Sequence, residues 1–237
     1  MIARGAPFGR DPMLTLALIL LVLAFLTGGI AAPLRSLATD PNAFVGFVIA
    51  IVLGITVHEF MHAYAAHRQG DDTAKALGRL TLDPRAHFDI FGTLLLVLAG
   101  FGYGKPVPFN ESRLRSTLGV SLVAVAGPLA NFAIAAVCAI PLRFDAAAAL
   151  GPNYEEILFY VVLYNCVLGI FNLLPIPPLD GSNVVYGFLP PRLQYTWRSY
   201  SQYGFLILLA LLWFGYRLLQ AIVFQPAFEL TKLLIGL

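Results

Sequence analysis

Charged residues are scarce in this chain: Asp, Glu, Lys and Arg together make up 12% of its 237 residues. Soluble domains carry about 25%, so the shortfall excludes an ordinary water-soluble globule. The formal net charge is only +2, which is too small to suggest a nucleic-acid partner. Hydrophobic residues make up 59% of the chain, and several apolar runs reach the roughly 20 residues that cross a bilayer. The composition predicts an all-α polytopic membrane protein.

Cysteine is rarer still. Its two copies, Cys138 and Cys166, both lie in apolar runs and form no CxxC pair, so the sequence predicts no disulfide framework. We interpret both as small buried core residues. The sequence also shows no long repeat, no low-complexity tract and no soluble domain of any size. We therefore expect one integral membrane domain over residues 1–237.

About six transmembrane helices are expected from the apolar runs. They cover residues 13–32, 42–67, 117–142, 156–171 with a resumption up to 189, 203–216 and 219–237. The first run also fits a cleaved signal peptide, but it is long for one, which favours an uncleaved helix. The last run is amphipathic enough either to span the bilayer or to lie on its surface.

A shorter apolar piece, FDIFGTLLLVLAGFGYG at 88–104, lies inside the otherwise basic region 68–116. It is too short and too rich in glycine for a comfortable span. We expect a small re-entrant or strand-like element at the membrane edge, with its backbone covered by protein or by a water cavity.

Lysine and arginine are distributed unevenly between the loops. The N-terminus carries two, the region 68–116 carries seven and the loop 190–198 carries two, whereas the opposite loops carry one each, Arg35 and Arg143. Because basic loops stay on the cytoplasmic side, the N-terminus and the region 68–116 are predicted to be cytoplasmic in a multi-pass protein of the cell membrane.

The stretch TVHEFMHAYAAH at 56–67 places ionisable side chains at the end of an apolar run. His58 and His62 are four positions apart, so on a helix they lie about 40° apart around the axis and about 6 Å apart along it, and both imidazoles can bind one tetrahedral ion. Glu59 can then reach a water on that ion, as in the H-E-x-x-H signature of metalloproteases.

The alternative is that the three side chains satisfy one another in the core. Ionisable groups at membrane depth cost about 2.5–3.5 kcal/mol each and usually mark function, which favours a metal site. His67, beside Arg68, is interpreted as mostly structural.

A catalytic zinc ion keeps three protein ligands and one open position. The candidate for the third ligand is Asp180, the one charged side chain between residues 157 and 189. The prolines of LLPIPPLDG prevent a regular helix there, and Gly181 permits unusual backbone geometry. Asp180 could instead cap the following helix. His87 and Asp89, in the charged loop, are competing ligand candidates.

These motifs resemble those of the site-2 protease family of intramembrane zinc metalloproteases, in its compact prokaryotic form. HEFMH at 58–62, GPLAN at 127–131 and NLLPIPPLDG at 172–181 match in order, and DPRAHFDIFGT and GKPVPFN also look like that family. The resemblance covers about residues 40–190. It implies one Zn²⁺ per chain with His58, His62 and Asp180 as ligands. It also implies Glu59 as catalytic acid/base and a site lined by Asn131 and by Asn165 or Asn172.

Two further points concern substrate selection and the role of Asn131. Many relatives carry an inserted PDZ domain or appended CBS domains, for which this sequence has no room, so the usual modules for substrate selection are not expected. Asn131, in an apolar setting, is read either as a helix–helix hydrogen bond or as a donor to the carbonyl oxygen under attack.

The expected activity is hydrolysis of a peptide bond within or near a transmembrane segment of a membrane-protein substrate, so the expected partners are that substrate and the bilayer, with no nucleic acid. A metal-ion transporter is one rival, but such proteins show paired repeats, and we find no second copy of either motif. A catalytically inactive homologue that binds membrane helices is another, and the intact Glu59 counts against it. The ligand set alone also suits iron.

Overall fold

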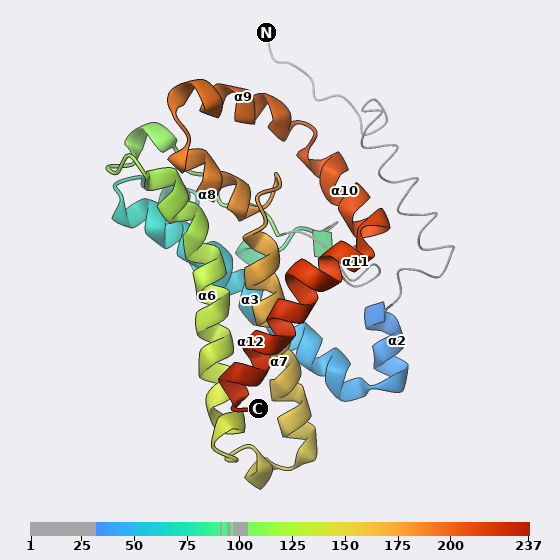
Figure 1. The fold of residues 1–237 in the computed structure, drawn as a ribbon. Coiled ribbons are helices and arrows are strands. Elements are labelled where there is room, and N and C mark those ends of the chain that lie inside the picture. The colour runs from blue at the N-terminus through green and yellow to red at the C-terminus, as the bar shows by residue number, and fades with distance from the viewer. Residues whose placement is uncertain (1–31, 91, 94–95, 97–103) are drawn as a thin grey trace.

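The computed structural model of the chain describes residues 32–90, 92–93, 96 and 104–237 (Figure 1). The first predicted span, 13–32, lies almost wholly outside the described residues, as does most of the predicted membrane-edge element. The two ends of that element are described, and Phe88 and Gly104 pair there in an isolated antiparallel bridge.

The described residues form helices and no strand. In chain order the elements are α2 (Ala32–Thr39), α3 (Pro41–Arg68), α4 (Thr73–Ala76), η1 (Pro84–Ala86), η2 (Glu111–Arg113), α6 (Gly119–Arg143), η3 (Ala148–Leu150), α7 (Pro152–Asn172), α8 (Asp180–Phe188), α9 (Pro191–Ser201), α10 (Gly204–Phe214), α11 (Tyr216–Leu219), the π-helical turn η4 (Gln220–Phe224) and α12 (Gln225–Ile235).

Within the described residues, four helices are long and apolar enough to cross a membrane: α3, α6, α7 and the continuous stretch Tyr216–Ile235 that includes α12. The predicted all-α polytopic class is thereby confirmed. The fifth predicted span is shorter than expected, because α10 has 11 residues and reaches only about 16 Å. The predicted connection 190–198 contains a helix that the sequence did not predict: α9 begins with Pro191, at a position where a helix needs no N–H.

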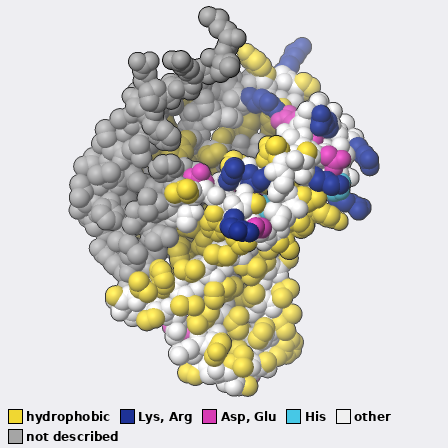
Figure 2. Space-filling view, turned by 180° about the vertical axis from the view of Figure 1, so that it is seen from behind, with side chains coloured by type: hydrophobic (Ala, Val, Ile, Leu, Met, Phe, Trp, Pro, Cys, Tyr) yellow, Lys and Arg dark blue, Asp and Glu magenta, His cyan; other side chains and the backbone are white. Residues whose placement is uncertain are grey.

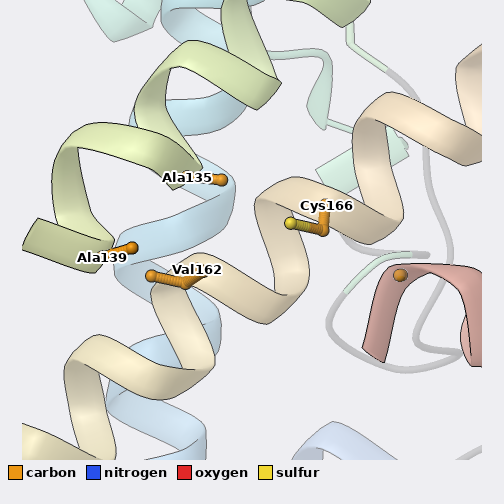
Figure 3. Close-up of a cluster of buried hydrophobic side chains, with 5 residues drawn as sticks. Ala135, Ala139, Val162 and Cys166 are labelled. Carbon is orange, nitrogen blue, oxygen red and sulfur yellow. The ribbon is translucent and has the colours of Figure 1, made fainter. Parts of the chain in front are cut away.

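The helices α3, α6 and α7 pack against one another, and α12 covers α6 and α7 (Figure 1). Small residues permit this close approach, as is usual where lipid replaces water. A Cβ on Gly46 of α3 would lie 2.6 Å from the Cβ of Tyr160 on α7. Between α6, α7 and α12 the buried cluster is built from Ala135, Ala139, Val162, Cys166 and Ala227, the first four labelled in Figure 3. Both cysteines are free and Cys166 is buried, as predicted, whereas Cys138 is only partly buried against this cluster.

The ends of α3 are fixed by polar contacts. Asp40 caps its N-terminus by accepting a hydrogen bond from the backbone N–H of Ala43, and it accepts another from the Tyr160 hydroxyl of α7 at 2.9 Å. The helix ends at Arg68, followed by Gly70 at a φ of +101°. Figure 2 shows hydrophobic side chains over the lower body of the molecule and charged side chains gathered toward its upper end. The HEFMH motif lies in the half of α3 that leads to the basic region 68–116.

Candidate metal centre

Two helices supply the three predicted ligands. His58 and His62 lie on the buried face of α3, and Asp180 is the first residue of α8, directly after the proline-rich break that follows α7. The Oδ2 atom of Asp180 lies 2.9 Å from Nε2 of His58 and 3.3 Å from Nε2 of His62. The two Nε2 atoms are 3.0 Å apart. The structure therefore brings together the ligand set that the sequence predicted.

The protonation of the two imidazoles follows from what their Nδ1 atoms contact. Nδ1 of His62 lies 2.7 Å from the backbone oxygen of Val123, which can only accept a hydrogen bond. Nδ1 of His58 lies 2.7 Å from Oδ1 of Asn131, whose amide nitrogen donates to the backbone oxygen of Gly54. Both imidazoles therefore carry their proton on Nδ1 and present the lone pair of Nε2 to the centre, as metal-ligating histidines do.

Three electron-pair donors thus face one another within 3.3 Å. Oδ2 of Asp180 is buried and receives no hydrogen bond, and such an arrangement is repulsive unless a cation lies between the atoms. A tetrahedral ion bound at about 2.0–2.1 Å holds its ligand atoms roughly 3.3 Å apart. The donor set therefore fits a divalent cation of the size of zinc.

Gly127, in the GPLAN motif of α6, gives this centre its space. A Cβ at that position would lie 2.4 Å from Nε2 of His62 and 2.5 Å from Nε2 of His58. Any side chain would enter the space that an ion needs. In the sequence, Gly127 was noted only as part of the GPLAN motif, because the absence of a side chain carries no chemical signal of its own.

Asn131 lies on α6 one turn from Gly127 and is fully buried. Its amide nitrogen donates to Gly54 and to Oδ1 of Asn165 on α7, at 3.3 and 3.1 Å. The interhelical reading of Asn131 is thereby favoured over the donor to a reacting carbonyl, because both of its amide hydrogens have acceptors within the protein. Asn165 donates to the backbone oxygen of Val161 and so belongs to the same network, whereas Asn172 donates to Leu168 of its own helix.

Glu59 follows the first ligand on α3 and is not part of the ligand group. Its half-buried carboxylate accepts a hydrogen bond from the backbone N–H of Val107, with Oε2 and N 3.1 Å apart. Val107 lies in the GKPVPFN stretch, and sequence reasoning missed its contribution because a backbone donor has no residue signature. The contact holds one carboxylate oxygen in place beside the centre.

The other candidate ligands lie elsewhere. His87 is buried, with Nε2 2.7 Å from the backbone oxygen of Thr81, and Asp89 accepts a hydrogen bond from the backbone N–H of Gly92. Nδ1 of His67 lies 2.5 Å from Oδ1 of Asp72, at the end of α3. The one group of His, Cys, Asp and Glu side chains within the described ranges that has metal-binding spacing contains none of these residues.

Comparison with known proteins agrees with this geometry. The sequence model of peptidase family M50 matches residues 46–147 and 141–214. These ranges contain all three predicted ligands and the GPLAN motif.

Curated relatives show the same similarity. The chain is 38% identical to a Bacillus subtilis protein named "Putative zinc metalloprotease YwhC", over 69% of this chain and 78% of that protein. It is 31% identical to a Mycolicibacterium smegmatis protein named "Putative zinc metalloprotease Rip2", over 82% and 78%. Against "Zinc metalloprotease MJ0392" of Methanocaldococcus jannaschii the identity is 27%, over 62% of this chain and 35% of that protein. No solved structure gives a significant match.

Asp180→Ala should abolish stable metal binding, because two neutral imidazoles remain and the anionic ligand is gone. Elemental analysis of the purified protein is expected to show about one zinc per chain in the wild type and almost none in the variant. Asp83→Ala is the matched control, since Asp83 pairs with the exposed Arg85 away from the centre. Equal zinc content in Asp180→Ala and wild type would refute the ligand assignment.

Gly127→Ala should weaken zinc binding at least about tenfold while the protein still folds, because the added Cβ displaces both imidazoles from the positions that their Nδ1 partners set. Zinc affinity by competition with a chelator measures the effect. Leu129→Ala, at a 56% exposed position of the same helix, serves as the control. Wild-type affinity in Gly127→Ala would show that the centre lies elsewhere.

Proposed function

The chain belongs to peptidase family M50 and is a membrane metalloprotease, and we propose that it is an intramembrane zinc endopeptidase of the site-2 protease type. The proposed reaction is hydrolysis of a peptide bond within or near a transmembrane segment of a membrane-protein substrate. The observation that supports this proposal best is the position of the ligand triangle. It is built on a helix long and apolar enough to cross a membrane, and it is closed by a carboxylate at a helix break.

The ligand roles follow from the contacts. His58, His62 and Asp180 hold one zinc ion, and Val123 and Asn131 fix the orientation of the two imidazoles. When bound at such a site, zinc supplies Lewis acidity and lowers the pKa of water to about 7. This makes a nucleophile available at neutral pH in a place where free hydroxide is scarce.

Glu59 moves the proton in this proposal. Its neighbour His58 is a ligand, so its carboxylate lies close to the centre without occupying a ligand position. The N–H of Val107 donates a hydrogen bond to Oε2, which fixes the orientation of the carboxylate. Glu59 takes a proton from the attacking water and delivers it to the leaving amine, a general acid–base role that contributes typically about 10²–10⁴-fold.

The substrate must be unwound before it can react. In a transmembrane helix the peptide groups are hydrogen-bonded and covered by side chains, so the carbonyl carbon is not accessible. We therefore propose a membrane-spanning substrate with glycine, proline or polar residues near the cleavage point. We also propose that the basic region 68–116 and the N-terminus are cytoplasmic, because basic loops stay on that side. The centre then lies within the membrane toward the cytoplasm, because His58 precedes the basic region by only about three helical turns.

Glu59→Gln is expected to keep the zinc and to lose cleavage of a membrane-protein substrate reconstituted with the enzyme, because the amide has no basic oxygen for the proton. The loss should be at least about a hundredfold in turnover. The zinc content of the same preparation is the internal control. A variant that turns over as fast as wild type would remove Glu59 from the chemistry, and a wild type that moves metal across the vesicle membrane without cleaving would favour the transporter.

A substrate whose transmembrane segment contains a Gly-Pro pair near its middle should be cleaved at least about tenfold faster, in kcat/KM, than a matched poly-Leu segment. The reason is that glycine and proline destabilise a helix by about 1 and 3 kcal/mol per residue. Both substrates are tested in the same vesicles with the same soluble tags. Equal rates would mean that unwinding does not limit the reaction.

A further inference from the structure

Arg79 is a buried cation outside the ligand group. Arg79 is only 6% exposed, although it lies in the basic segment between α4 and η1. Its Nε atom is buried without an acceptor. Arginine is almost never buried unless it is paired. The burial of this guanidinium therefore needs an explanation, because a charge that only keeps a surface loop soluble would be exposed.

Two interactions of Arg79 point toward the centre. Its Nη2 atom donates a short hydrogen bond to the backbone oxygen of Lys105. Its charge also interacts with that of Glu59: burial lowers the pKa of the guanidinium, and the Glu59 carboxylate opposes that lowering. Arg79 thus touches the segment that contacts Glu59 and lies within electrostatic reach of Glu59 itself.

The segment 104–110 is held by residues from several parts of the chain. The N–H of Lys105 donates to the backbone oxygen of His87 at 2.7 Å, and the N–H of Asn110 donates to the buried carboxylate of Asp71 at 2.5 Å. Between these anchors, Arg79 binds the carbonyl of Lys105, and the N–H of Val107 binds Glu59 at 3.1 Å. The Val107 side chain is buried against Ala63 and Ala74. The contacts of Arg79 and Glu59 with the backbone are therefore two residues apart.

We propose that Arg79 is a positioning residue for Glu59. Its guanidinium fixes the carbonyl of Lys105, which keeps the N–H of Val107 on Oε2 of Glu59. This inference rests on the proposed catalytic role of Glu59.

Arg79→Met tests the proposal in the full chain, in detergent or in vesicles. Hydrogen exchange at the amides of Lys105 and Val107 should accelerate at least about tenfold, and kcat should fall at least about tenfold with KM within about twofold of the wild type. Zinc content should stay at the wild-type level, because no ligand partner is changed. Arg85→Met is the matched control: Arg85 has a 91% exposed side chain paired with Asp83, and its loss should change none of the three readouts.

The outcomes separate the parts of the argument. Wild-type exchange at both amides in Arg79→Met overturns the proposal, and so does faster exchange with an unchanged kcat. If the wild type cleaves no substrate, the proposed function fails, while the exchange experiment still decides whether Arg79 holds the segment. If Arg79→Met does not fold, Arg79→Lys decides the question. It keeps the charge and loses the planar fork, so it should show smaller changes in the same direction, and wild-type exchange and kcat in Arg79→Lys would overturn the proposal.

Discussion

The structure depends on one close contact between three electron-pair donors. Nε2 of His58, Nε2 of His62 and Oδ2 of Asp180 meet within 3.3 Å of one another. Without a cation these atoms repel one another, and with one they would supply three of its four ligands and leave one position open. The crossing of α3 and α6 at Gly127, the break after α7 and the start of α8 at Asp180 all serve this contact.

The polar groups around the triangle give it a fixed orientation. A polar side chain buried in a span is costly when it has no partner, yet Asn131 and Asn165 are fully buried and hydrogen-bonded to each other and to the backbone. The same network ends on Nδ1 of His58. One set of hydrogen bonds therefore joins α3, α6 and α7 and also selects the tautomer that binds metal. The hydrogen bonds that hold these helices together therefore also fix the geometry of the predicted ligands.

The sequence was sufficient for what side-chain chemistry and spacing encode. The pair His58 and His62 followed from helical periodicity, and Asp180 followed from being the one charged side chain in a long apolar region. The apolar runs predicted α3, α6 and α7 within a few residues. Gly127, Val107 and Arg79 were not assigned a site role, because they act through an absent Cβ, a backbone N–H and a contact between distant loop segments. Helix α9 was missed because its polar composition is typical of a loop.

The predicted ligands and Glu59 are held by different parts of the molecule. The ligands belong to α3 and α8, and the hydrogen-bond partners of the two imidazoles belong to α6. Glu59 is held instead by the segment 104–110, which is anchored to the charged residues Asp71 and Arg79 outside the spans. A displacement of that segment would leave the ligand triangle intact and change only the orientation of the carboxylate. If Glu59 transfers the proton as proposed, metal binding and proton transfer are therefore physically separable in this protein, and the polar segment is the part through which proton transfer can vary alone.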